Sequence, residues 1–253
     1  MKQAGPDLNI LQVTAMAATL VVALMAWELL SLLLQTPTLP GPWAVLHEMV
    51  ANQQEGLLLH FLASTRRVLV SLVVSLAGAV PLGLYLGRNP RVDAWVAPFL
   101  YLTYPIPKIV LLPIVLTLLG LSDTSRIFLV TLTVFYQILV TTRDAVRALP
   151  AAAIYSVRSL GARERQIYRH VLFPFALPKI FTALRISVGT AIAVLFFAES
   201  FATNSGLGYL IMDAWGRANY ELMFASVVAL SLLGLVLYLM IQLLERSLCK
   251  WQR

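Results

Sequence analysis

The chain has 253 residues, of which 59% are hydrophobic and only 12% are charged, and its formal net charge is +7. Soluble domains carry about 25% charged residues, so this composition excludes a water-exposed globular domain. The single cysteine, Cys249, excludes a disulfide framework and a paired-cysteine metal site. Segments 68–87 and 222–244 contain no charged side chain and reach the roughly 20 residues that a helix needs to cross a bilayer. The composition therefore indicates an all-α, polytopic membrane protein.

The apolar segments predict about six transmembrane helices. The first is longer than the apolar region of a secretion signal, which has roughly 7–15 residues, so we interpret it as a retained span. Residues 35–65 are proline-rich and then amphipathic, and they either lie along the membrane surface or cap the outer face. We therefore divide the chain into residues 1–62, with the first span and this exterior segment, and a core of residues 63–253. The predicted spans are residues 9–34, 68–87, 97–119, 127–142, 180–199 and 222–244.

Basic residues assign a side of the membrane to each loop. With both termini inside, thirteen of the 19 Lys and Arg residues lie in interior segments, whereas Arg66, Arg67, Arg126 and Arg217 lie in exterior loops. Positive charge favours the cytoplasmic side, so we expect both termini in the cytoplasm. The interior loop 143–179 alone holds seven basic residues.

Small and charged residues within the spans indicate packing or pathway roles. Gly83 and Gly87 have the spacing for close helix approach, which favours a packing seam. Lys108 follows Pro107 near the middle of the third span, where an ionisable side chain is costly and prolines leave carbonyls without helical donors. Its ammonium either lines the pathway and attracts an anion or extends to the cytoplasmic face from an irregular segment.

The large interior loop carries helix signals that the distribution of charge does not explain. Ala151–Ser159 predicts one short helix and residues 162–171 a second, with Gly161 between them. We expect Pro174 and Pro178 to stop the helix and to turn the chain back into the membrane. A helical hairpin with apolar and basic patches is suited to binding another protein.

No catalytic constellation is recognisable in the sequence. A Walker A loop places Gly directly before Lys, but the four lysines follow Met, Pro, Pro and Cys, so no phosphate-binding loop is possible. His47 and Glu48 lack the second His of a zinc-protease signature, because Ala51 occupies its position. We predict that the chain is not an enzyme and that a partner supplies the energy.

Residues 159–174, SLGARERQIYRHVLFP, resemble the EAA loop of permease subunits in binding-protein-dependent ABC importers. Gly161 and the Val-Leu-Phe-Pro at 171–174 match the spacing of that signature, with Val for Ile and Phe for Leu. The Glu-Ala-Ala triplet should fall at 155–157, where this chain has Tyr-Ser-Val. Resemblance to the nitrate, sulfonate, taurine and bicarbonate branch of the family extends over residues 64–87, 105–129, 177–200 and 204–211.

The resemblance implies several partners in a prokaryotic cytoplasmic (inner) membrane. They are a pair of cytoplasmic ATP-binding subunits, which would hold ATP and magnesium, a second permease copy in a homodimer, and an extracytoplasmic substrate-binding protein. Membrane lipid would surround the spans, and no cofactor in this chain and no nucleic acid partner are expected.

The resemblance also assigns candidate residues. The interior loop of this family forms coupling helices that sit in a groove of the ATPase subunit. Glu199 would lie near the outer gate, with either a gate or structural role or the role of a simple interfacial charge. The docking candidates are Arg158, Leu160, Gly161, Ala162, Arg165, Ile167 and Arg169. The pathway and gate candidates are Pro107, Lys108, Glu199, Gly206 and Gly208.

The expected function is import of a small anion such as nitrate, a sulfonate, taurine or bicarbonate. The same importer class for a vitamin-like aromatic, of the riboflavin or thiamine-precursor type, is the alternative. An ion-gradient secondary transporter is a further rival, but it would usually need more spans with intramembrane acids and gives residues 151–178 no role.

Overall fold

The computed structural model describes residues 10–51, 56–201 and 203–252, and within these ranges the chain is helical with no strand. Short 3-10 turns occur at Lys108–Leu111 and Lys250–Gln252, and a π turn at Tyr168–Leu172. The helices are α1 (Ile10–Leu34), α2 (Pro42–Ala51), α3 (Leu57–Arg88), α4 (Pro90–Thr103), α5 (Leu112–Leu119), α6 (Asp123–Arg147), α7 (Ala151–Ser159), α8 (Glu164–Ile167), α9 (Phe173–Ser200), α10 (Leu207–Gly216) and α11 (Tyr220–Leu248).

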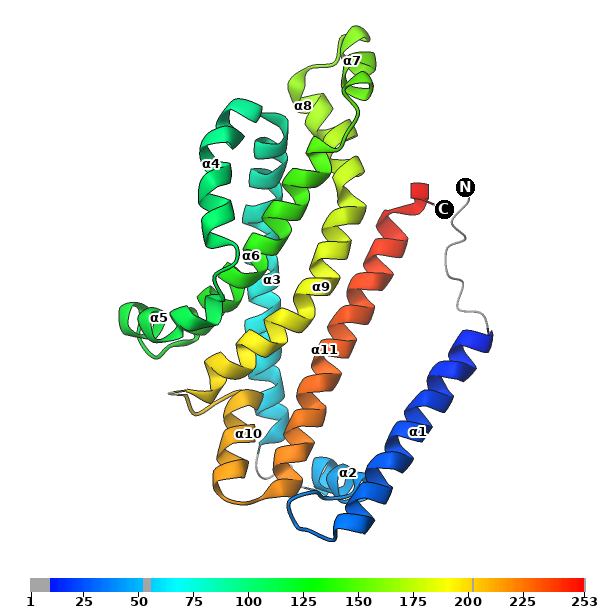
Figure 1. The fold of residues 1–253 in the computed structure, drawn as a ribbon, viewed down its shortest axis with the longest axis vertical. Helices are drawn as coiled ribbons and strands as arrows, with labels where there is room; N and C mark the ends of the chain where they lie inside the picture. The colour runs from blue at the N-terminus through cyan, green and yellow to red at the C-terminus, as the bar shows by residue number, and fades with distance from the viewer. Residues whose placement is uncertain (1–9, 52–55, 202, 253) are drawn as a thin grey trace.

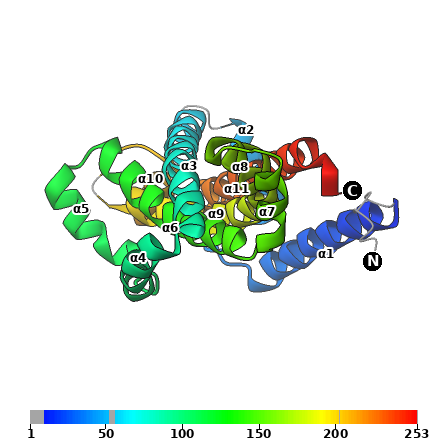
Figure 2. The same ribbon diagram turned by 90° about the horizontal axis from the view of Figure 1, so that it is seen from above.

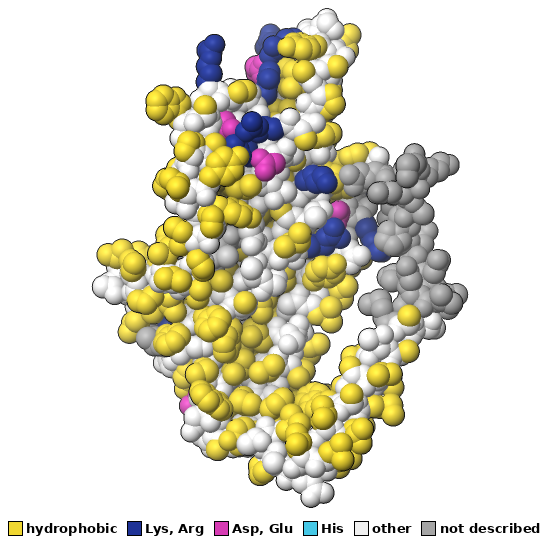
Figure 3. Space-filling model, in the orientation of Figure 1, with side chains coloured by type: hydrophobic (Ala, Val, Ile, Leu, Met, Phe, Trp, Pro, Cys, Tyr) yellow, Lys and Arg dark blue, Asp and Glu magenta, His cyan; other side chains and the backbone are white. Residues whose placement is uncertain are grey.

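Four long helices, α3, α6, α9 and α11, form the central bundle (Figure 1). Helices α7 and α8 extend beyond one end of it, which we call the hairpin end, whereas α2 and α10 lie at the opposite end. Seen from above, α1 and α5 lie on opposite sides of the bundle (Figure 2). Lys and Arg side chains gather toward the hairpin end, and the rest of the visible face is mainly hydrophobic (Figure 3).

The prediction of about six spans is confirmed by length and composition. Over the described residues, five helices are long and apolar enough to cross a membrane: α1, α3, α6, the continuous stretch Glu164–Ser200, and α11. A bent pair, α4 with residues 108–119, makes the sixth if it is one span. Residue 9 of the first predicted span lies outside the described residues.

The prediction of one continuous third span over 97–119 is wrong. Helix α4 and the helical segment that begins at Lys108 are bent by 83° with respect to each other. Pro105 and Pro107 lie in the break and cannot donate backbone hydrogen bonds, so two donors are missing within three residues, which favours a break here.

The described helices also extend further than the apolar runs that predicted them. Helix α3 begins at Leu57 and α6 at Asp123, so Arg66, Arg67 and Arg126 lie within helices and not in exterior loops as predicted. The predicted spans ended at these charged residues because the apolar runs end there. In the structure their side chains form hydrogen bonds within the bundle, so the helices extend past them. The segment 35–65, which we predicted to be exterior, contains the short helix α2, and its last residues form the beginning of α3.

Pro174 and Pro178 do not stop the helix, contrary to our expectation. The chain is helical from Glu164 to Ser200, and the first proline falls at the start of α9 directly after the π turn. A proline needs no amide donor in the first turn of a helix, and a π turn changes the hydrogen-bond pattern just ahead of the ring. The second arm of the hairpin is therefore continuous with a membrane span.

The predicted packing seam at Gly83 and Gly87 is confirmed. A Cβ atom on Gly83 would lie 2.9 Å from the carbonyl oxygen of Leu139, and one on Gly87 would lie 2.7 Å from that of Arg143. Helices α3 and α6 thus approach so closely that only glycine fits at these two positions.

Candidate functional site

Helix α7 ends in a glycine-dependent turn that creates the hairpin. Gly161 has φ of +84°, its N–H donates to the carbonyl of Arg158 at 2.9 Å, and the next N–H, of Ala162, donates to Val157 at 3.3 Å. These two bonds close the last turn of the helix in a Schellman motif. A Cβ on Gly161 would meet nothing within 4 Å, so the backbone conformation and not the available space requires glycine.

The second arm of the hairpin is attached to the bundle by apolar contacts, among them that of Ile167, and by an ion-pair triad. Ile167 is fully buried in the main core cluster. The Glu164 carboxylate accepts hydrogen bonds from Arg158 of α7 and from Arg88 at the end of α3, the latter at 3.3 Å. The second arm is therefore attached to both α3 and α9.

The exposed side of the hairpin combines apolar and basic side chains. Leu160 is 86% exposed and Tyr155 65% exposed. Arg165 and Arg169 are also exposed, and Gly161 lies at the tip between the two arms. Tyr155 was missed because the family signature directed attention to the glycine and to the residues after it.

The seven docking candidates thus divide by environment. Arg158, Leu160, Gly161, Arg165 and Arg169 are exposed, and Ala162 is half-buried. The burial of Ile167 does not fit a direct contact with a partner, and its side chain instead holds the hairpin to the core.

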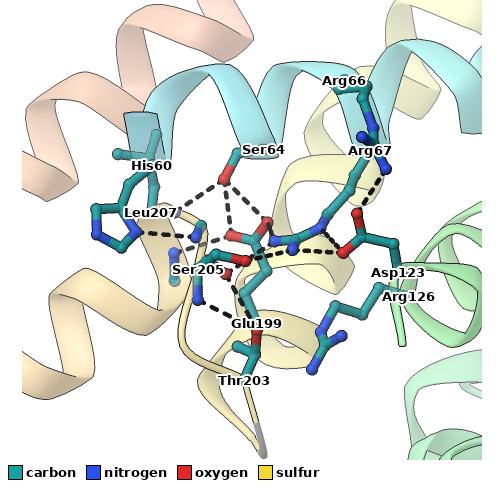
Figure 4. Close-up of polar contacts among 12 residues, drawn as sticks. His60, Ser64, Arg66, Arg67, Asp123, Arg126, Glu199, Thr203, Ser205 and Leu207 are labelled. Atoms are coloured by element: carbon teal, nitrogen blue, oxygen red, sulfur yellow. Dashed lines mark hydrogen bonds and ion pairs between the residues drawn. The ribbon is translucent and has the colours of Figure 1, made fainter. Parts of the chain in front are cut away.

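A second cluster, buried near the opposite end of the bundle, surrounds Glu199 (Figure 4). The carboxylate of Glu199 is fully buried and accepts hydrogen bonds from the Ser64 hydroxyl, from Arg67 Nη1 at 2.7 Å and from the backbone N–H of Gly208 at 3.0 Å. A buried charge is tolerated only when it is paired and hydrogen-bonded, and this carboxylate has both.

Arg67 is the centre of this cluster and uses all five of its N–H donors. Its guanidinium donates to the Asp123 carboxylate at 2.6 and 2.9 Å, to Glu199, and to both the hydroxyl and the carbonyl of Ser205 at 2.7 and 2.8 Å. These partners belong to α6, α9 and the loop before α10. Arg67 thereby joins α3 to three other parts of the chain.

Two glycines allow the loop before α10 to close over Glu199. Gly206 has φ of +109°, and a Cβ there would lie within 2.5 Å of both Glu199 carboxylate oxygens. A Cβ on Gly208, inside α10, would lie 2.6 Å from the carbonyl oxygen of Phe196. Both residues thus serve close approach, whereas only Gly206 also needs the freedom of glycine's backbone. Of the two roles open for Glu199, the geometry is that of a structural anchor and not of an interfacial charge.

Lys108 makes contacts that neither of the two alternatives anticipated. Its ammonium donates to the carbonyls of Thr103, Tyr104 and Ile106 at the end of α4, and it lies 4.4 Å from the ring centre of Tyr136. A cation is favourable at the C-terminus of a helix, where carbonyls lack donors. Lys108 therefore stabilises the break that follows α4, and Pro107 immediately precedes the 3-10 turn of this break.

A further buried ion pair, which sequence reasoning missed, joins α4 to α6 near the hairpin end. The Asp93 carboxylate accepts hydrogen bonds from Arg143 through Nε and Nη2, and from Arg147 Nη1 at 2.7 Å. Asp93 and Arg143 are almost fully buried. Asp93 is an isolated acidic residue in the otherwise basic segment after α3, and this was the sequence signal that could have indicated the ion pair.

The structure is thus a helical membrane bundle that is tied by buried ion pairs and carries an exposed hairpin attached to two of its helices. Residues 79–250 match the family described as binding-protein-dependent transport system inner membrane component. The chain belongs to this family and is a permease subunit of an ABC importer.

Curated relatives cover most of the chain. It is 30% identical to the taurine transport system permease protein TauC of Escherichia coli (strain K12), over 95% of this chain and 90% of that protein. It is 28% identical to the formylaminopyrimidine transport permease protein ThiX of Halalkalibacterium halodurans (strain ATCC BAA-125 / DSM 18197 / FERM 7344 / JCM 9153 / C-125), over 90% of this chain and 91% of that protein.

A solved structure shares the fold. The chain aligns with a chain from an inward-facing conformation of the MetNI methionine ABC transporter with a TM-score of 0.63, over 76% of this chain and 95% of that chain. The sequence identity is 20%, so this likeness supports the fold alone.

Proposed function

We propose that this permease imports a small anion, as one half of a homodimer driven by a pair of ATP-binding subunits and supplied by a soluble binding protein. The anion class is supported by relatives named for taurine and for aliphatic sulfonates, whose head group is a sulfonate. The relative named for formylaminopyrimidine supports the second candidate, a vitamin-like aromatic solute.

The single observation that carries this mechanism is the hairpin of α7 and α8. Its tip exposes apolar and basic side chains, while Ile167 and the Glu164 triad fix it to α3 and α9. A surface that is exposed on one side and rigidly attached on the other is suited to receive force from a bound subunit. The absence of a phosphate-binding loop in the sequence agrees with ATP hydrolysis by that subunit.

We place the hairpin end in the cytoplasm, together with both termini. Basic side chains concentrate toward this end (Figure 3), as the positive-inside rule requires. The opposite end, with α2 and α10, then faces the binding protein.

The transport cycle follows from this arrangement. Closure of the ATPase pair on ATP binding brings the two hairpins together, and their attachment to α3 and α9 tips the spans so that the pathway opens outward. Hydrolysis separates the ATPase subunits and returns the spans to the inward-facing state. One chain supplies one hairpin, so two copies are needed for a pair of ATPase subunits.

Copurification tests the proposal. The tagged permease is expected to retain an ATP-binding subunit, and Arg165→Glu or Gly161→Asp should weaken that retention. Arg217→Glu is the matched control, because Arg217 lies beyond α10 at the opposite end and pairs with Asp213. Transport by the purified permease alone in vesicles, driven by an ion gradient, would contradict the proposal.

A further inference from the structure

Two polar side chains meet on the surface of the bundle, far from either of its ends. The side-chain amide of Gln137, in α6, donates a hydrogen bond at 3.2 Å to the hydroxyl of Thr190, in the neighbouring helix α9 (Figure 1). Gln137 lies about 21 Å along α6 from Asp123, and Thr190 about 15 Å along α9 from Ser200, at 1.5 Å per residue. Both helices are long and apolar enough to cross a membrane, so the pair lies within its hydrocarbon core, which is about 30 Å thick.

The contacts of this pair do not satisfy its hydrogen-bonding groups. Thr190 is exposed and Gln137 is half-buried. Gln137 has two N–H groups, and its hydrogen bonds within the described part of the chain are all to Thr190. The single hydroxyl hydrogen of Thr190 goes either to Gln137 or to the carbonyl of Ser187. One N–H of Gln137 therefore has no acceptor among the described residues, which is unfavourable against lipid.

An exposed hydroxyl at similar depth in α11 does not carry this cost. Ser231 lies about 16 Å along α11 from Tyr220, and its hydroxyl donates to the carbonyl of Val227 in the same helix at 2.9 Å. A serine that is satisfied within its own helix can face lipid, whereas the glutamine amide keeps a donor unpaired. The face of α6 and α9 that carries the pair is therefore expected to adjoin water or protein.

The exposed face of α9 has its smallest side chains at the level of the pair. Gly189, Thr190 and Ala193 are exposed there, and a Cβ on Gly189 would meet nothing within 4 Å. Large exposed side chains lie before and after them, Ile186 toward the hairpin end and Phe197 toward the opposite end. A small molecule that contacts this face therefore has most room beside the polar pair.

A positive charge lies at the same depth. The ammonium of Lys108 lies 4.4 Å from the ring centre of Tyr136, which directly precedes Gln137 in α6. The 3-10 turn that begins at Lys108 contacts both α6 and α9. The hydrogen bonds of this ammonium go to uncharged carbonyls, so they do not neutralise its charge. An anion at this level thus meets a positive charge as well as N–H and O–H donors.

We propose that Gln137 and Thr190 line the solute pathway between two permease copies and contact the transported solute about halfway across the membrane. The proposal rests on the proposed import of a small anion by a homodimer, and it adds residues that bind the anion inside the membrane. The amide and the hydroxyl donate to the oxygen atoms of the anion. Because both groups are uncharged, they bind it weakly enough for release. The same face of the second copy lies opposite and closes the pathway.

Cysteine labelling of the complete importer in vesicles tests whether this face meets water. Cys249→Ala first removes the single cysteine, which is buried. In this background, Gln137→Cys and Thr190→Cys should react with sulfonatoethyl methanethiosulfonate, a water-soluble anion, about tenfold faster or more than the matched control Ser231→Cys. Relative to their rates with a free thiol, this anionic reagent should also react faster than its trimethylammonium counterpart, because of Lys108.

Uptake with the cognate binding protein tests contact with the solute. Gln137→Leu and Thr190→Val keep the size of each side chain but remove its donors, so each should slow anion uptake about fivefold or more. Thr190→Ser keeps the hydroxyl and should retain most of the uptake. Ser231→Ala, the control on α11, should transport like the wild type. Retention of the ATP-binding subunit and the unfolding temperature should be unchanged in Gln137→Leu and Thr190→Val.

Three results would overturn the pathway site. The first is labelling of the two cysteines no faster than that of Ser231→Cys. The second is unchanged anion uptake by both Gln137→Leu and Thr190→Val. The third is loss of the ATP-binding subunit in these two variants, which would assign the pair to assembly of the complex.

The pathway site and the proposed anion substrate fail separately. Unlabelled cysteines in an importer that takes up anions overturn the site and leave the proposed function intact. Labelled cysteines that do not favour the anionic reagent, in an importer that takes up only uncharged solutes, overturn the anion and leave the pair in the pathway.

Discussion

Arginine serves opposite purposes at the two ends of this molecule. Arg67 is 2% exposed, and all five of its N–H groups donate hydrogen bonds to residues of its own chain. By contrast, Arg165 and Arg169 on the hairpin are exposed. The buried arginine holds helices together, and the exposed ones are the residues that we propose to contact the ATP-binding subunit. Burial, and not residue type, therefore decides which arginines of this basic permease are structural and which are available for docking.

The largest effect is expected from Arg67→Ala. It leaves the buried Glu199 carboxylate without its ion-pair partner, and breaking a buried pair from one side costs about 3–5 kcal/mol. Thermal unfolding in detergent should show a large fall in stability. Arg66→Ala is the matched control, because Arg66 is mostly exposed and its pair contributes about 1 kcal/mol or less. Equal losses in the two variants would contradict the assigned role of Arg67.

Gly206→Ala should be the next most damaging change. The new Cβ would collide with the Glu199 carboxylate, and the backbone at φ of +109° is strained for any other residue, so we expect a loss of about 2 kcal/mol or more. Gly216→Ala, at the end of α10 with nothing within 4 Å of its Cβ, should change stability little. Similar unfolding temperatures for both variants would show that the loop does not close over Glu199 as described.

Gly161→Ala makes the same substitution at the hairpin and should destabilise the protein less than Gly206→Ala. Its positive φ predicts a cost of about 1 kcal/mol, smaller than at Gly206 because no atom lies in the way of the Cβ. Because the Schellman turn orients α7, we expect reduced retention of the ATP-binding subunit with only a small change in unfolding temperature. A stability loss as large as that of Gly206→Ala would contradict this distinction.

Glu164→Gln should have the smallest effect on stability. The triad that it forms with Arg88 and Arg158 is partly exposed, and such pairs contribute about 0–1 kcal/mol. The expected loss is in coupling, measured as transported solute per ATP hydrolysed, because the hairpin would be attached to α3 less firmly. An unchanged ratio would show that the apolar contacts of the second arm transmit the movement without the triad.

Local patterns in the sequence were sufficient for much of the fold. The bounds predicted for Ala151–Ser159 agree with α7, because a proline before it and a glycine after it define both ends. Hydrophobicity located the spans, and the spacing of Gly83 and Gly87 located the seam between α3 and α6.

Long-range pairing and backbone geometry were not readable in the same way. Arg67 and Glu199 are 132 positions apart, and no local pattern shows that an arginine beside a span will turn inward to a distant carboxylate. The prolines at 174 and 178 suggested a helix stop, but Pro174 falls in the first turn of α9 directly after a π turn, and α9 continues through Pro178. Prolines and Lys108 marked an irregular point after α4, but the bend of 83° could not be read from them.

Uptake by Leu160→Asp in vesicles that contain the complete importer is the most direct test of the hairpin as the docking point. Leu160 is 86% exposed at the tip, so the new charge should leave the unfolding temperature of the permease unchanged. We predict that ATP-driven uptake is abolished, because the apolar contact with the ATP-binding subunit is lost. Uptake at the wild-type rate by the stably folded variant would contradict the account.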